Sequence, residues 1–284
     1  MDTQDLFKSR KKERTTSRDK DRFIGITDSL VYLPLIYGIR HNLIEHNFYI
    51  QFGNIIENAN KLREGELELG IISSLDYALK KEKWLIVPEL CVSSTQKIKL
   101  VQLFFKKGLK DIRKIAVDKN AVSEFILLQI MMREKFLITP EYKKMEPDLD
   151  KMLFDADAAL IIGDQALNYY MTNPNRLDLN DEWVDMTGLP FVYSFWAGRE
   201  FTITANDLKL LDSSFQLGIN NIEKISKDYA KTHMDNWVFY HDFFTQNISY
   251  TFSDHEKDGL NEFYNYAFFY GFAEFIPELH FYKS

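Results

Sequence analysis

Five short turns of polar residues follow or open apolar runs in this 284-residue sequence, and they are the places where chemistry could occur. Hydroxyl groups and free backbone N–H groups at helix starts bind carboxylates well. Each turn is also an ordinary helix cap, so a single one would indicate little. Convergence of all five on one cleft would form an anion-binding site. The turns are Thr27-Asp28-Ser29, Ser73-Ser74, Ser93-Ser94-Thr95, Ser123-Glu124 and Gly163-Asp164.

Other common catalytic or metal-binding patterns do not accompany these turns. The sequence contains no HExxH, P-loop, GxSxG or GxGxxG pattern. His41 and His46 flank a predicted helix end, where a cation is favourable, and the histidines show no metal-ligand spacing. Cys91 is the only cysteine, has no histidine nearby, and is expected to be a buried small residue. We therefore expect neither a metal nor a cofactor.

The elements that would hold these turns are short apolar runs alternating with helical patterns. We predict Asn54 as a helix cap and Gly65 near the end of the same helix. The order of elements indicates parallel sheets, and the pattern after Ala205 is helical nearly to the end. The predicted strands are residues 22–27, 47–53, 67–73, 97–105, 111–118, 158–163 and 189–197, and the predicted helices are residues 31–43, 54–66, 74–81, 121–136 and 164–171.

Two long predicted strands, residues 97–105 and 189–197, bracket the middle of the chain. They favour an α/β protein with two lobes, in which both strands cross between the lobes. Lobe I would comprise residues 23–106 plus 197–284, and lobe II, inserted into it, residues 107–196. Ligands of α/β proteins bind in such clefts, at the carboxyl ends of parallel strands. We expect a small-molecule ligand in the interlobe cleft.

The charge distribution limits the other partners. The net charge is −7, which argues against nonspecific nucleic-acid binding. Residues 1–22 carry eight Lys and Arg against five Asp and Glu, and we expect them to form a disordered basic arm. No apolar run of 18 residues occurs, so we expect no membrane insertion and a cytoplasmic protein. The oligomeric state stays open, a homodimer included.

Several long blocks, in order, resemble the chorismate dehydratase family of menaquinone biosynthesis by the futalosine route. They are "LREGELELGIISSLDYAL", "VPELCVSS", "PDLDKMLFDADAALIIGDQAL", "LDLNDEWVDMTGLPFVYSFWAGR" and "NISYTFSDHEKDGLNEFYNYAFFYGF". The similarity covers roughly residues 23–284. It implies the type II periplasmic-binding-protein fold, with its central interlobe cleft, which agrees with the two lobes expected above.

The resemblance also implies an activity. Enzymes of that family are lyases that remove water from chorismate to give 3-enolpyruvylbenzoate, and aromatisation of the ring drives the reaction. Such a protein would hold two carboxylates, orient the ring and assist departure of hydroxide, without metal or cofactor. By the resemblance, Ser73, Ser74 and Ser123 would bind carboxylates, Asp164 would orient a donor, and Trp196 would pack on the ring.

Three departures from the family pattern fall on the expected substrate side. The family pattern Y-L-N-[ST]-x-P-L reads "SLVYLPL" here, with Val31 at the asparagine position. Valine can neither donate nor accept a hydrogen bond. Leu100 replaces a serine, and Glu124 falls in a turn that is typically threonine-serine. A carboxylate about 4 Å from an anionic ligand would repel it by roughly 4 kcal/mol at an effective dielectric constant near 20.

These departures leave alternatives open. The chain is a chorismate-dehydratase-like lyase, or a divergent cytoplasmic homologue that has lost dehydration and binds or converts a different, less anionic molecule. Thr27 and Asp28, in the first turn, are also candidate substrate contacts, and a shift of the aligned turn by one or two residues would leave Asp28 to do the polar work. A third hypothesis, a partner-binding role through the basic arm, rests on residues 1–22 alone. No catalytic residue is assigned from the sequence.

Overall fold

The computed structural model describes residues 21–80, 82–233 and 236–283. Its first sheet has six strands in the order β11-β4-β10-β3-β1-β2. Strands β1, β2 and β3 are parallel, whereas β10 and β11 run antiparallel to β4. The bounds are β1 (Arg22–Ile26), β2 (Phe48–Phe52), β3 (Leu69–Ser73), β4 (Trp84–Ser94), β10 (Phe191–Arg199) and β11 (Ser249–Phe252). We call this sheet and its covering helices lobe I.

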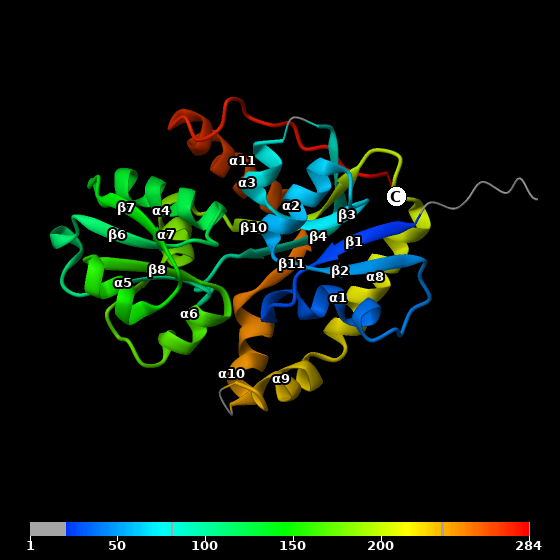
Figure 1. Ribbon diagram of the computed structural model, residues 1–284, viewed down its shortest axis with the longest axis horizontal. Helices are drawn as coiled ribbons and strands as arrows, with labels where there is room; N and C mark the ends of the chain where they lie inside the picture. Colours follow the sequence, from blue (N-terminus) through cyan, green and yellow to red (C-terminus); the bar gives the residue numbers. More distant parts are fainter. Residues whose placement is uncertain (1–20, 81, 234–235, 284) are drawn as a thin grey trace, which may run out of the picture.

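The second sheet has five strands in the order β7-β6-β8-β5-β9. Strand β6 is parallel to both β7 and β8, and β5 is antiparallel to both β8 and β9. The bounds are β5 (Val101–Phe105), β6 (Lys114–Asp118), β7 (Glu141–Met145), β8 (Ala158–Ile162) and β9 (Arg176–Asp178). This sheet and its helices form lobe II, which lies beside lobe I in Figure 1.

Helices cover both sheets. In lobe I they are α1 (Leu33–Arg40), α2 (Ile55–Glu64), α3 (Ser74–Ala78), α8 (Ala205–Ile219), α9 (Ile222–Ala230), α10 (Trp237–Asp242) and α11 (Asp254–Phe269). In lobe II they are α4 (Ser123–Glu134), α5 (Leu149–Asp155), α6 (Gly163–Tyr170) and α7 (Leu179–Thr187). Short helical turns occur at η1 (Leu30–Tyr32), η2 (Leu109–Asp111) and η3 (Phe243–Asn247). Helices α2, α3 and α11 lie together on one side of the lobe I sheet, and α1, α8 and α9 lie on the other (Figure 1).

The predicted helix boundaries at Asn54 and Gly65 are confirmed. The Asn54 side chain accepts from the Glu57 backbone N–H, and the Glu57 carboxylate accepts from that of Asn54, which makes a capping box at the start of α2. Gly65 ends the helix with a φ of 78°, in the left-handed region that favours glycine.

The predicted lobe boundaries were wrong. The run 97–105 does not cross between the lobes as one strand, because β5 lies wholly in the second sheet. Strand β10 likewise pairs with β3 and β4 along its length, so residues 191–196 belong to lobe I. The chain passes between the sheets in residues 95–100 and 188–190. A local pattern predicts a strand, but only the pairing partners decide to which sheet it belongs.

The predicted basic arm lies almost wholly outside the described residues, which begin at Asp21. Its predicted last residue, Arg22, is the first residue of β1, and its guanidinium pairs with the Asp207 carboxylate at 2.6 Å. Among the described residues, no helix is both long and apolar enough to cross a membrane.

Candidate functional site between the lobes

A cavity of about 490 Å3 lies between the two lobes. Both lobes contribute to its wall, largely through residues that follow strands β1, β3, β6 and β8. We call it the interlobe cavity. It is lined by Thr27, Asp28, Ser29, Val31, Tyr32, Asn54, Ile55, Ser73, Val92, Ile98, Leu100, Val101, Asp118, Asn120, Glu124, Pro147, Ile162, Gly163, Asp164, Gln165 and Tyr193.

Seven of the ten sequence-predicted site residues line this cavity. Strands β1, β3, β6 and β8 are parallel within their sheets, so the turns after them meet at facing edges. The carboxyl ends of the strands therefore bring the predicted turns together. The seven are Thr27, Asp28, Val31, Ser73, Leu100, Glu124 and Asp164. The other three, Ser74, Ser123 and Trp196, are buried and are not lining residues.

The lobe I wall is formed by the turn after β1 and by η1. Pro34, at the second position of α1, fixes the start of that helix directly after η1. The Tyr250 hydroxyl donates to the Val31 carbonyl oxygen at 2.8 Å and so ties η1 to β11. Val31 and Leu100 are 6% and 4% exposed and give the cavity apolar surface where the related family carries polar side chains.

Tyr32 is a cavity residue that the sequence did not single out as a ligand contact. It stands where the related family carries a small hydroxyl residue, and this was the only signal for it. Its hydroxyl oxygen accepts from Ser194 Oγ at 3.2 Å. Burial raises the pKa of its phenol well above the ordinary value, so the phenol keeps its hydrogen. Among the described residues, no hydrogen bond donated by this hydroxyl is found.

The lobe II wall holds a carboxyl group with a shifted pKa. Glu124 lies in the first turn of α4, and its Oε2 accepts from the Val122 backbone N–H at 3.1 Å. The pKa of this carboxyl is raised to about 7, mainly by burial; backbone hydrogen bonds oppose the shift, and the nearby charges of Asp118 and Asp76 add to it. At neutral pH, therefore, Glu124 is populated in both protonation states.

Asp118 is the second carboxyl of lobe II in the cavity, and the sequence did not indicate it either. It is the last residue of β6 and is 2% exposed. Its Oδ1 accepts from the backbone N–H of Asn120 at 2.9 Å and from the Asn120 side chain at 3.1 Å. Burial raises the pKa of the Asp118 carboxyl as well. Its position could have been found only by locating the end of β6.

The cavity wall is acidic. Asp28, Asp118, Glu124 and Asp164 all line it, whereas no Lys or Arg does so among the residues described by the structure. Asp28 is exposed, and its carboxylate pairs with the Arg40 guanidinium at 2.5 Å. An incoming anion therefore meets carboxyl groups of both lobes.

Ser73 cannot act as the sequence predicted without rearrangement. Its Oγ donates to Asp76 Oδ2 at 2.7 Å and accepts from the Asp76 backbone N–H at 3.0 Å. Asp76 is in turn held by the Arg63 guanidinium at 2.6 Å. Because a hydroxyl has one hydrogen, Ser73 can offer a ligand only a lone pair, whereas a ligand carboxylate needs a donor.

Ser74 and Ser123 join the lobes behind the cavity. Ser74 Oγ donates to the Val192 carbonyl oxygen at 2.7 Å and lies 3.1 Å from Ser123 Oγ. Ser123 Oγ also accepts from the Leu75 backbone N–H at 3.0 Å. The predicted role of these serines as carboxylate ligands does not fit this position, because their hydroxyls satisfy buried backbone groups at the junction of α3 and α4.

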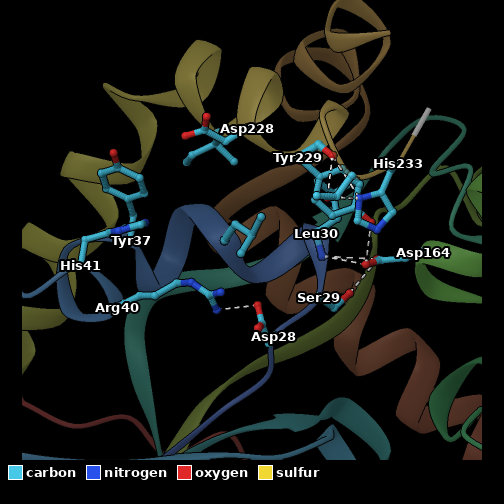
Figure 2. A pocket seen from close by; sticks show the side chains of 13 residues that line it. Asp28, Ser29, Leu30, Tyr37, Arg40, His41, Asp164, Asp228, Tyr229 and His233 are labelled. Atoms are coloured by element: carbon cyan, nitrogen blue, oxygen red, sulfur yellow. Dashed lines mark hydrogen bonds and ion pairs between the residues drawn. The ribbon is translucent and has the colours of Figure 1, made fainter. Parts of the chain in front are cut away.

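Two further predicted site residues, Trp196 and Thr27, differ in their surroundings. Trp196 of β10, which pairs with Ile71 of β3, is fully buried. Its side chain packs in the core of lobe I and does not line the cavity. Thr27 Oγ1 accepts from the Asn58 side chain at 3.3 Å, which leaves its hydrogen for a ligand. Asp164 lines the cavity, but its carboxylate accepts hydrogen bonds from lobe I (Figure 2).

The described residues contain no cluster of three or more His, Cys, Asp or Glu that could hold a metal ion.

Two sheets joined by two crossing segments, with a cavity between them, define the periplasmic-binding-protein class of fold. A structure from Archaeoglobus fulgidus superposes with a TM-score of 0.71 at 18% identity, covering 90% of this chain and 99% of that one. The periplasmic aliphatic sulphonate binding protein of Escherichia coli gives a TM-score of 0.62 at 15% identity, covering 91% and 94%. A Candida albicans protein described as having the generic periplasmic binding protein fold gives 0.58 at 12%, covering 86% and 90%.

Within that class the chain belongs to the menaquinone biosynthesis family, whose profile matches residues 23–268. A chorismate dehydratase from Thermus thermophilus is 28% identical over 155 residues, which are 49% of this chain. The match spans 56% of the length of that relative. The family resemblance and the fold class expected from the sequence are thus confirmed.

Proposed function

We propose that the protein is a chorismate-dehydratase-like lyase of menaquinone biosynthesis that binds its substrate in the interlobe cavity. The observation that carries the proposal is the pair of carboxyl groups, Asp118 and Glu124, in the cavity of a member of this family. The relative from Thermus thermophilus supports the choice of reaction. A cytoplasmic location stays a prediction.

Loss of water from a ring requires a base for the ring proton and an acid for the departing hydroxyl. With a pKa of about 7, Glu124 can be protonated at neutral pH. It is still acidic enough to donate that proton to the departing hydroxyl. Asp118, in its ionised form, would take the proton from the adjacent carbon. The C–H and C–O bonds break, a ring double bond forms, water leaves, and solvent restores both carboxyl groups. The Tyr32 phenol would orient the substrate by donating its hydrogen.

A second candidate function is favoured by the charge of the wall. Chorismate is a dianion, and it meets Asp118, Glu124 and Asp164 with no cationic lining residue among those described, since Arg40 pairs only with Asp28 from outside the wall. Ser73 has no hydrogen to offer it. A divergent homologue that binds or converts a less anionic molecule with an apolar body would fit Val31 and Leu100 better.

Purified protein mixed with chorismate tests the proposal. We expect loss of the diene absorbance together with formation of 3-enolpyruvylbenzoate, identified by chromatography. Glu124→Gln keeps the shape but removes the acid, so we expect kcat to fall about 100-fold with little change in KM. Absence of turnover at high enzyme concentration, with no heat of chorismate binding, would leave the second candidate.

Glu124→Ser separates the two functions further. If Glu124 is the acid, this variant also loses turnover. If Glu124 only repels the anion, restoring a small hydroxyl should instead raise chorismate binding or turnover, measured by calorimetry and by the same product assay. Glu141→Gln makes the same change as Glu124→Gln at an exposed position of β7 outside the cavity, so it is the control and should leave kcat within about twofold of the wild-type value.

A further inference from the structure

Asp164 is the second residue of α6 in lobe II, yet its hydrogen-bond partners lie in lobe I. Gly163 precedes it with a φ of 66°, a left-handed conformation that glycine adopts without strain. The Gly163 N–H donates to the Leu100 carbonyl oxygen at 2.8 Å. The turn after β8 is thereby fixed, and the Asp164 side chain extends from lobe II toward η1 and α9.

The Asp164 carboxylate accepts from three groups of lobe I. Ser29 Oγ donates to Oδ1 at 2.8 Å, and the Tyr229 hydroxyl of α9 donates to Oδ2 at 2.8 Å. The Leu30 backbone N–H, at the first residue of η1, lies 3.3 and 3.2 Å from the two oxygens. Hydrogen bonds to an ionised acceptor are stronger than those between neutral groups. Figure 2 shows Asp164 reaching Ser29 and Leu30 on one side and Tyr229 on the other.

The lobes also contact each other at places other than Asp164. Ser74 and Ser123 form one such contact, where α3 meets α4. In another, Asn180 of α7 donates to the Ser94 carbonyl oxygen of β4 at 3.1 Å and accepts from the Tyr193 hydroxyl of β10 at 2.9 Å. The chain crosses between the lobes in residues 95–100 and 188–190. Of these interlobe contacts, the one at α6 depends on a single carboxylate side chain, that of Asp164.

A second cavity, of about 410 Å3, lies beside the interlobe cavity between α1 and α9 (Figure 2). Asp28, Ser29 and Asp164 line both. The bond from Ser29 to Asp164 thus forms part of the partition between them. Rupture of that bond and of the one to Tyr229 would join the two spaces and widen access to the interlobe cavity.

We propose that Asp164 is a latch that holds lobe II closed on lobe I over the interlobe cavity. It is a positioning residue, not a ligand contact, because lobe I donors occupy both of its carboxylate oxygens. Ligand entry and release would require this one side chain to exchange its partners for water. The proposal does not depend on which molecule the cavity binds, so it survives or fails separately from the proposed function.

Small-angle X-ray scattering of the full chain without ligand tests the latch. We expect Asp164→Ala to increase the radius of gyration, while thermal unfolding stays cooperative. The Leu30 amide, which loses its acceptor, should exchange its hydrogen with deuterium at least tenfold faster. Asp150→Ala removes a carboxyl from the first turn of another lobe II helix, where the side chain is exposed, and should change neither quantity.

A variant that removes only one of the hydrogen bonds to Asp164 keeps the proposal testable if Asp164→Ala folds poorly. Tyr229→Phe keeps the ring that stacks on His233 and removes only the donor, so it should shift both measurements in the same direction by less. Added to Asp164→Ala, Tyr229→Phe should cause no further change. Unaltered scattering and exchange in both single variants, or full additivity in the double variant, would overturn the latch.

Discussion

Glu124 contributes to the proposed chemistry at a cost to the stability of the fold. Folding raises the pKa of its carboxyl from 4.5 to about 7, so the folded state binds its proton more tightly than the unfolded state. Below pH 4.5 the group is protonated in both states, and above pH 7 it is charged in both. The free energy of unfolding therefore falls as the pH rises through this window.

Glu124→Gln should remove that loss. An amide fills the same space without a charge, so we expect the variant to be more stable than the wild-type protein at pH 8 by about 3 kcal/mol, and nearly equal to it at pH 4.5. Urea unfolding at the two pH values measures the difference. Equal stability at both would mean that Glu124 is solvated in the folded protein.

At the residue scale, the sequence predicted which residues lie at the cavity better than it predicted which hydrogen bonds they make. The turns containing Thr27, Glu124 and Asp164 line the cavity, because residues that follow parallel strands share an edge. The sequence could not predict that Ser73 already donates its hydrogen. The acceptor is Asp76, one helical turn later, and Arg63 of another helix holds that carboxylate in place. Ser74 and Ser123 were misjudged for the same reason.

At the scale of elements, close packing of α8 against α1 fixes the position of η1, which precedes α1. Helix α8 crosses α1 at Gly218, where an added Cβ would lie 2.0 Å from the Pro34 carbonyl oxygen. Since this neighbour is backbone, it cannot move without shifting the start of α1, which follows η1 directly. The small residue at Gly218 thus positions Val31 and Tyr32 indirectly.

Gly218→Ala should therefore destabilise the protein by about 2–3 kcal/mol, measured by urea unfolding. Gly108→Ala is the matched control, because its backbone has a φ of −67° and the nearest atom to an added Cβ is 3.7 Å away. We expect that variant to be as stable as the wild-type protein or slightly more stable. A loss at Gly108 equal to that at Gly218 would contradict the packing argument.

Most long elements could be predicted, but the long strand β4 was missed, and so were the short exposed strands. Strands β7 and β9 lie at the edges of the second sheet, and β11 lies at an edge of the first. The residues of β7, "EYKKM", carry charges that typically protect an edge strand, so they lack the apolar alternation that marks a strand in the sequence. Strand β11 falls in the region predicted as helical after Ala205, and its pairing with β4 decides its conformation.

At the scale of the whole molecule, the two-lobed architecture followed from the order of elements and from the family resemblance. The boundaries did not, because the runs 97–105 and 189–197 each look like one strand, while the chain changes sheets just before each strand begins. Two crossing segments and several interlobe contacts, those at Ser123 and Asp164 among them, join the lobes, and one acidic cavity lies between them. The carboxyl groups of lobe II therefore carry the proposed chemistry.

The pH dependence of kcat for chorismate dehydration, compared between the wild-type protein and Glu124→Gln, tests that central claim most directly. We predict that wild-type kcat falls above pH 7 as Glu124 loses its proton, and that the residual rate of the variant lacks this alkaline limb. The same alkaline limb in both proteins would contradict the assignment of Glu124 as the acid. Absence of wild-type turnover at every pH would contradict the proposed lyase activity itself.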